Sequence, residues 1–106
     1  MVHTHSVYAT TLACLHWEIP AVHYLVGFAG KKVPVAPYAT FGTPALAASA
    51  VTALGDDGLA CLLANHGQVA VGEDLWQALR VAQEVEELAA IYCGTLAIGG
   101  AQVLSA

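Results

Sequence analysis

The most informative stretch of the chain is Leu59-Ala60-Cys61-Leu62-Leu63-Ala64, enclosed by Asp56-Asp57-Gly58 before it and Asn65-His66-Gly67 after it. A short, fully apolar run between turn residues is typical of a strand buried on both faces of a sheet. The turn that ends this strand carries a histidine. Because α/β proteins place their sites at strand ends, His66 is a candidate functional residue.

Clear helix signals lie on both sides of this strand. Thr43-Pro44 predicts a helix start, with Thr43 as N-cap and proline at the first helical position, and Gly55 predicts its end. The segment Gln68–Val71 either continues the strand past a bend or begins another one. Asp74 and Gln77 form a pair like a capping box, and apolar residues then recur at helical spacing until Gly99-Gly100.

The N-terminal part of the chain predicts a similar alternation. Val2–His5 is a short extended segment, and Ser6 is a plausible N-cap for a helix over Val7–His16. Ile19-Pro20 ends that helix and leads to an apolar strand over Ala21–Val26. The two prolines in Val33–Tyr38 favour an edge or irregular strand. The order of strands and helices indicates an α/β or α+β fold.

Composition restricts the class of protein. The chain has 106 residues, enough for one small domain, yet 58% are hydrophobic, 10% are charged and the mean hydropathy is +0.64. A small domain normally needs more polar residues to cover its surface. The C-terminal segment Leu88–Ala106 is too rich in glycine and polar residues to predict a membrane span. We therefore expect other protein to cover the apolar excess, either other subunits of a homo-oligomer or a further part of the same domain.

Charge and cysteine content narrow the possibilities further. The net charge is −5, with Lys31, Lys32 and Arg80 as the fixed cations, which argues against a nucleic-acid partner. The three cysteines lie in separate apolar runs and predict small buried side chains in a reducing compartment. Two early histidines and the lack of a basic segment argue against a signal peptide. A cytoplasmic protein is expected.

Histidines provide the strongest chemical signal. His3 and His5 are two residues apart on an extended segment, so their side chains project from the same face. Together with His66 they could hold Zn²⁺ and leave an open position, which is the arrangement of a catalytic zinc site. An HxH pair is common by itself, however, so spacing alone leaves the metal site open. The acidic cluster Glu84, Glu86 and Glu87 is interpreted as a solvated helix face.

Several segments, taken in order, resemble one known family. They are Val2-His3-Thr4-His5, Ile19-Pro20-Ala21-Val22-His23-Tyr24, Val35-Ala36-Pro37-Tyr38-Ala39-Thr40-Phe41-Gly42-Thr43, Asn65-His66-Gly67 and Ala82-Gln83-Glu84-Val85-Glu86. Each is weak alone, but together they resemble the class II aldolase/adducin family through almost the whole chain. The resemblance implies a three-layer α/β/α domain, of which residues 1–106 would be the C-terminal portion, lacking the N-terminal half.

The resemblance also implies a function. Such a zinc-dependent aldolase cleaves a sugar 1-phosphate, such as L-fuculose 1-phosphate, to dihydroxyacetone phosphate and an aldehyde, and it assembles as a homotetramer with sites at subunit contacts. His3, His5 and His66 match the zinc ligands of the family. Tyr24 matches a catalytic tyrosine implicated in proton transfer across a subunit boundary, and Phe41 matches a residue near the aldehyde end of the site.

The chain also departs from the family pattern. In the family, the region before the HxH segment supplies an acidic zinc ligand that acts as general base and the loops that bind phosphate. Here the HxH begins at His3, and neither Glu18 nor Glu73 lies where a substitute is expected. We therefore expect this chain alone to have little aldolase activity. A pentulose-phosphate 4-epimerase or related enzyme of the same fold, and a non-enzymatic adducin-like assembly module, stay open as alternatives.

Overall fold

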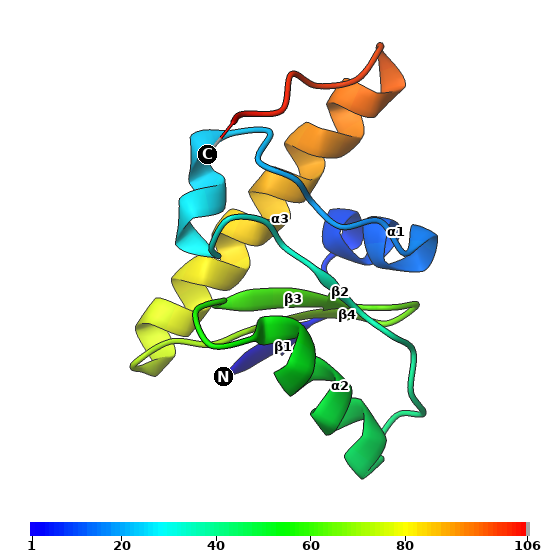
Figure 1. Ribbon diagram of the computed structural model, residues 1–106, viewed down its shortest axis with the longest axis vertical. Helices are drawn as coiled ribbons and strands as arrows, with labels where there is room; N and C mark the ends of the chain where they lie inside the picture. Colours follow the sequence, from blue (N-terminus) through cyan, green and yellow to red (C-terminus); the bar gives the residue numbers. More distant parts are fainter. Residues whose placement is uncertain (106) are drawn as a thin grey trace.

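A mixed four-stranded sheet lies between helices in the computed structural model, which describes residues 1–105 (Figure 1). The elements are β1 (Val2–Thr4), α1 (Val7–Leu15), the 3₁₀ helix η1 (Tyr24–Phe28), β2 (Val35–Ala36), α2 (Pro44–Leu54), β3 (Ala60–Leu63), β4 (Gly67–Ala70) and α3 (Leu75–Ala97).

The strands are arranged in the order β1-β4-β3-β2. β3 and β4 form an antiparallel hairpin, β1 pairs antiparallel with β4, and β2 pairs parallel with β3. Every residue of the two central strands is buried. The predicted strand over Leu59–Ala64 is thus confirmed, and Gln68–Val71 begins a new strand rather than continuing the first.

Helices cover both faces of the sheet, which confirms the three-layer α/β/α architecture. α1 and α3 pack together on one face, whereas α2 packs on β2 and β3 from the other (Figure 1). The main core lies on the α1 and α3 side, around Leu12, Leu62 and Leu88. A smaller cluster around Cys61 and Leu63 lies under α2.

The sequence signals for the helix ends act as expected. The Thr43 hydroxyl accepts a hydrogen bond from the Leu46 amide, and the Asp74 carboxylate accepts one from the Gln77 amide at 2.8 Å. Gly55 ends α2 with a φ of 64°, in the left-handed region that glycine adopts at little cost. These local hydrogen bonds satisfy amides that the helices leave unpaired.

The prediction of a strand over Ala21–Val26 is wrong. This segment bends and then forms η1, in which the His23 side chain accepts a hydrogen bond from the Leu25 amide at 3.1 Å. Val26 is nonetheless buried, because η1 packs against α3. The apolar run therefore indicated burial correctly, but the burial is against a helix and not within the sheet.

The interpretation of the acidic cluster as a solvated face is wrong for two of its three members. The Glu84 side chain is only 16% exposed. The other member is Glu86. Its two carboxylate oxygens accept hydrogen bonds from the backbone amides of Tyr8 and Ala9, at 3.0 and 2.9 Å. Ser6 occupies the N-cap position of α1, but its side chain makes no capping hydrogen bond. A carboxylate from α3 therefore satisfies the first turn of α1, where the helix dipole also favours negative charge.

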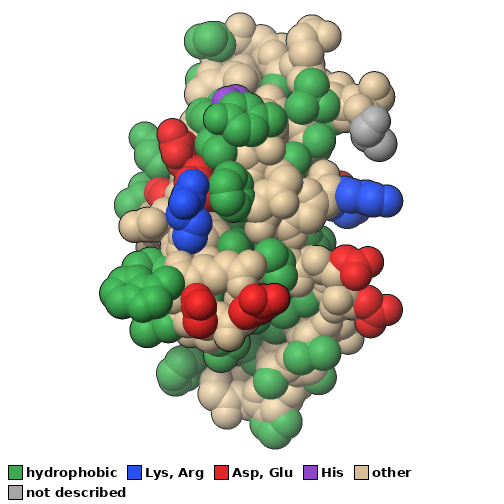
Figure 2. All heavy atoms as spheres, turned by 90° about the vertical axis from the view of Figure 1, so that its left-hand side faces the viewer, with side chains coloured by type: hydrophobic (Ala, Val, Ile, Leu, Met, Phe, Trp, Pro, Cys, Tyr) green, Lys and Arg blue, Asp and Glu red, His purple; other side chains and the backbone are tan. Residues whose placement is uncertain are grey.

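The cysteines are free, but only one of them is fully buried. Burial raises the pKa of the Cys61 thiol to about 11, whereas Cys14 is exposed, contrary to expectation. Apolar side chains also reach the surface, where Figure 2 shows them surrounding separate acidic and basic groups on one face. Within residues 1–105, no helix is both long and apolar enough to span a membrane.

Candidate metal centre

The sheet brings the three predicted histidine ligands together. His3 lies on β1 opposite Val69 of β4, and His66 lies in the turn that immediately precedes β4. The antiparallel pairing of β1 and β4 therefore places the HxH segment beside that turn. The centroids of the three imidazole rings are 4.8 to 4.9 Å apart in every pair.

The spacing of the imidazole nitrogens fits one small metal ion. Nε2 of His3 and Nε2 of His5 are 3.2 Å apart, and each of the three residues offers a ligand atom within 4.8 Å of the other two. Nitrogens bound tetrahedrally to Zn²⁺ at about 2.0–2.1 Å are about 3.3 Å from one another. Small side-chain rotations would therefore complete a three-histidine site.

The backbone of β4 orients His3. Nδ1 of His3 lies 2.8 Å from the carbonyl oxygen of Gln68, so this nitrogen is the donor and Nε2 keeps its lone pair for the cluster. The Gln68 side chain is buried, and its amide nitrogen donates to Ser6 Oγ at 3.2 Å and to the Ala82 carbonyl at 3.0 Å. These bonds fix β4 against α3 and thereby hold the carbonyl that orients His3.

The protonation of His66 also favours metal binding. Partial burial lowers its pKa from 6.5, and the neighbouring positive charges that His3 and His5 can carry lower that pKa further. A lowered pKa keeps the imidazole neutral near pH 7. Neutral imidazole is the form that binds a metal ion.

Gly67 allows β1 to approach the turn closely. A Cβ atom at this position would lie 2.2 Å from the Thr4 carbonyl oxygen and 3.0 Å from Cδ2 of His5. Any side chain here would push β1, and with it the HxH segment, away from His66. The glycine of the Asn-His-Gly turn is therefore a requirement of the cluster's geometry.

An apolar groove opens beside the histidines, between α2 and the sheet. Its volume is about 420 Å³. His3, His66 and Phe41 are among its lining residues, and the ring centroid of Phe41 is 6.2 Å from that of His66. Phe41 is 81% exposed, so it borders the entrance rather than filling the core. The structure therefore brings Phe41 close to the candidate ligands.

Tyr24 is not brought to the histidines within this chain. It begins η1, is 76% exposed, and its ring lies 4.5 Å from that of His23. In Figure 1, η1 (cyan) lies against α3, on the opposite side of the molecule from the turn between β3 and β4. The predicted catalytic role of Tyr24 would therefore require a site on another copy.

The histidine cluster contains no carboxylate among residues 1–105. Glu18 instead pairs with Lys32 at 2.9 Å, and the backbone amide of Glu73 binds the Gln77 side chain. Neither residue serves as a fourth ligand here. The histidines alone can hold and polarise a ligand, whereas a general base would have to come from elsewhere.

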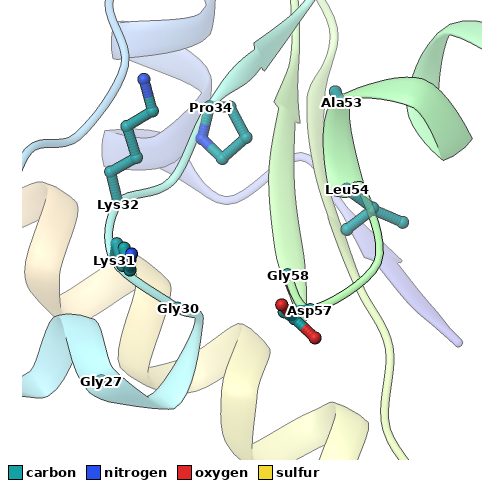
Figure 3. Close-up of a pocket in the computed structure, with 9 residues that line it drawn as sticks. All are labelled: Gly27, Gly30, Lys31, Lys32, Pro34, Ala53, Leu54, Asp57 and Gly58. Carbon is teal, nitrogen blue, oxygen red and sulfur yellow. The ribbon is translucent and has the colours of Figure 1, made fainter.

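A second hollow, of about 450 Å³, lies between the Lys31-Lys32 turn and the end of α2 (Figure 3). It contains Lys31, Lys32 and Asp57 as its charged residues. Figure 3 shows the Lys32 side chain rising away from Asp57, and its ammonium group is engaged by Glu18. This hollow combines no set of ligands comparable with the histidine cluster.

Sequence reasoning missed three residues that surround the centre: His16, Asn65 and Gln68. Nε2 of His16 donates to Oδ1 of Asn65 at 2.6 Å, and Gln68 acts through its backbone carbonyl. The Asn-His-Gly turn was a usable signal for Asn65, because asparagine tolerates left-handed backbone. No local signal pointed to His16, which the sequence placed at a helix end without a partner.

Comparison with known proteins identifies the family of this chain. The family described as Class II Aldolase and Adducin N-terminal domain matches residues 1–93. This chain therefore belongs to that family, which confirms the resemblance seen in its sequence.

Several relatives of this chain are named as aldolases. The 5-deoxy-D-ribulose 1-phosphate aldolase of Bacillus thuringiensis serovar kurstaki is 50% identical over 104 residues, covering 98% of this chain and 48% of the relative. The L-fuculose phosphate aldolase of Escherichia coli K12 is 46% identical over 99 residues, covering 92% and 46%. A solved L-fuculose 1-phosphate aldolase matches with a TM-score of 0.94 at 47% identity, over 97% of this chain and 48% of that one. The chain thus spans about half the length of these relatives.

Proposed function

We propose that this chain forms the metal-holding part of a class II aldolase site. The reaction would cleave a sugar 1-phosphate, such as L-fuculose 1-phosphate or a 5-deoxypentulose 1-phosphate, to dihydroxyacetone phosphate and an aldehyde. The observation that carries the proposal is the convergence of His3, His5 and His66 at ligand distance. The names of relatives at 46–50% identity support the reaction class.

Each residue of the candidate site would have a separate role. The three imidazoles would hold Zn²⁺, which, when bound, supplies Lewis-acid polarisation of the substrate's oxygen atoms. Gln68 orients His3 through its carbonyl, and Phe41 borders the apolar groove where the aldehyde end of a substrate could lie. Tyr24 would move a proton in a site of a neighbouring copy.

Assembly follows from the same proposal. Tyr24 lies far from the histidines of its own chain, and large apolar side chains are exposed on several elements. Both features favour a homo-oligomer, which would be a tetramer by resemblance to the family. A cytoplasmic location fits an enzyme of sugar-phosphate metabolism whose thiols are free.

Zinc binding by the purified chain tests the proposal. We expect one zinc ion per chain, measured by competition with a chromophoric chelator. His66→Ala should weaken binding more than about 100-fold, because even changes outside the ligand shell cost about 10–100-fold. His23→Asn is the matched control, since it removes an imidazole outside the cluster. A chain that binds no zinc, or binds it equally well without His66, would contradict the proposal and favour an assembly module.

Turnover provides a separate test. Without a carboxylate in the cluster, we expect cleavage of L-fuculose 1-phosphate by this chain alone to be negligible. Release of dihydroxyacetone phosphate, followed with a coupled reductase, measures it. A rate near that of an intact aldolase would show that the chain supplies a general base that its histidine cluster does not contain.

A further inference from the structure

The turn that carries His66 is fastened to the C-terminal end of α1 by two hydrogen bonds. The Asn65 amide donates to the Ala13 carbonyl at 3.0 Å. Nε2 of His16 donates to Oδ1 of Asn65 at 2.6 Å. One bond comes from the backbone of the helix end and the other from a side chain, so both the position and the orientation of Asn65 are fixed.

Both partners of the side-chain bond have left-handed backbone. The φ angle is 56° at His16, which caps α1, and 60° at Asn65. Glycine would take either conformation at lower cost, and asparagine tolerates it better than histidine does. His16 and Asn65 are also the non-glycine residues with positive φ among residues 1–105. The two residues with this strained backbone are thus also the two partners of one side-chain hydrogen bond.

The fastened residue directly precedes a candidate ligand. On its other side, His66 is followed by Gly67, which packs against the Thr4 carbonyl. The His66 amide itself donates to the Leu63 carbonyl at 2.9 Å. His66 is therefore held between α1 on one side and β1 on the other, which limits how far its imidazole can move from His3 and His5.

We propose that His16 and Asn65 are positioning residues for the metal centre. Their hydrogen bond holds the Asn65-His66-Gly67 turn so that the His66 imidazole faces His3 and His5 before an ion arrives. Preorganised ligands bind a metal more tightly, because less ordering remains to be done on binding. This inference rests on the proposed function for the identity of the metal centre, but it concerns residues outside the ligand set.

Glycine substitutions isolate the side-chain bond. His16→Gly, Asn65→Gly and the double variant each keep a residue that accepts a positive φ, so the turn and the helix cap can persist. Leu15→Ala is the matched control, because Leu15 is a half-exposed side chain at the same helix end. Cobalt(II) serves as the probe, since it gives a visible spectrum that reports the number and geometry of its nitrogen ligands.

Each single glycine variant should bind Co²⁺ about 10-fold more weakly than the wild type, as expected for partners of metal ligands. The double variant should be no weaker than the weaker single variant, because the two substitutions remove the same bond. The visible band of the bound ion should shift in all three variants and stay unchanged in Leu15→Ala. A purely structural role would lower the melting temperature without shifting this band.

The outcomes separate the two proposals. A wild-type chain that binds no cobalt would contradict the proposed function, and this positioning role with it. A wild type that binds cobalt, with glycine variants equal to it in affinity and spectrum, would overturn the positioning role alone. Additive losses in the double variant would also overturn it, because they would show that the two residues act separately.

Discussion

The two faces of the sheet are built differently. Under α1 and α3 lies a core of fifteen buried residues, to which α3 alone contributes five. Under α2 lies a cluster of four, and α2 itself has no fully buried residue within the described chain. The groove beside the histidines opens on this second face.

The difference accounts for part of the unusual composition, because large apolar side chains are also exposed on α1 and α3. One face is a complete helix-on-sheet core, in which apolar area is removed from water and stabilises the fold. The other face leaves apolar side chains such as Phe41 and Val51 exposed, at 81% and 68%. The apolar excess noted in the sequence is therefore concentrated partly where the candidate site opens. The main core and the candidate site therefore lie on opposite faces of the same sheet.

The largest expected effect is a difference in stability loss between two valine-to-alanine substitutions, one on each face of the sheet. Val85→Ala, in the core beneath α3, should lower the free energy of unfolding by about 2–3 kcal/mol, because it removes a buried side chain and leaves a cavity. Val51→Ala, on α2, should change it by less than about 0.5 kcal/mol. Urea unfolding followed by circular dichroism measures both. Equal losses would contradict the contrast between the faces.

Gly67→Ala should destabilise the chain by about 1–3 kcal/mol, because the added Cβ would overlap the Thr4 carbonyl. It should also abolish tight zinc binding by displacing the HxH segment. Gly94→Ala is the matched control: this glycine lies in α3 with open space around it, so alanine should stabilise the helix by about 0.5–1 kcal/mol. A Gly67→Ala variant with unchanged stability and zinc affinity would show that the position of β1 does not depend on the close approach of Gly67 to the Thr4 carbonyl.

Glu86→Ala should lower the free energy of unfolding by about 1 kcal/mol, because two amides of α1 lose their acceptor. Glu87→Ala, one residue along on the exposed side of α3, should have little effect. Thermal unfolding of the pair measures the difference. Identical melting temperatures would show that the carboxylate of Glu86 is not the cap of α1.

The smallest expected effect is a pH dependence due to His66. Its pKa in the folded chain lies below 6.5, so between that value and 6.5 the unfolded state binds more protons. The stability of the metal-free chain should therefore decline as the pH falls through 6.5. His66→Ala should weaken this decline. Melting temperatures between pH 7.5 and pH 5 test it; a steeper decline in His66→Ala would contradict the direction of the shift.

Much of the fold could be predicted from the sequence, because its signals are local. Caps at Thr43 and Asp74, and the apolar run that became β3, depend on neighbours in the chain. The failures involve long-range contacts. The segment Ala21–Val26 is buried by α3, and Glu86 is engaged by α1, from nearly eighty residues away. Neither partner can be read from local periodicity.

The candidate site likewise has residues that the sequence could predict and supporting contacts that it could not. The spacing of His3 and His5 and the strand-end position of His66 are local signals, and the family resemblance added Tyr24. The supporting bonds of His16 with Asn65, and of Gln68 with His3, join distant segments. They became visible only once the strand order was known. The ligand assignments and the role of Tyr24 stay predictions that the chemistry must test.

X-ray absorption at the zinc edge of the loaded chain tests the central claim most directly. The proposed site predicts three imidazole nitrogens at about 2.0–2.1 Å in the wild type. It predicts two in His66→Ala, at a zinc concentration high enough to load that variant. The same number of imidazoles in both proteins, or a zinc ion bound through the cysteines, would contradict a centre made by His3, His5 and His66.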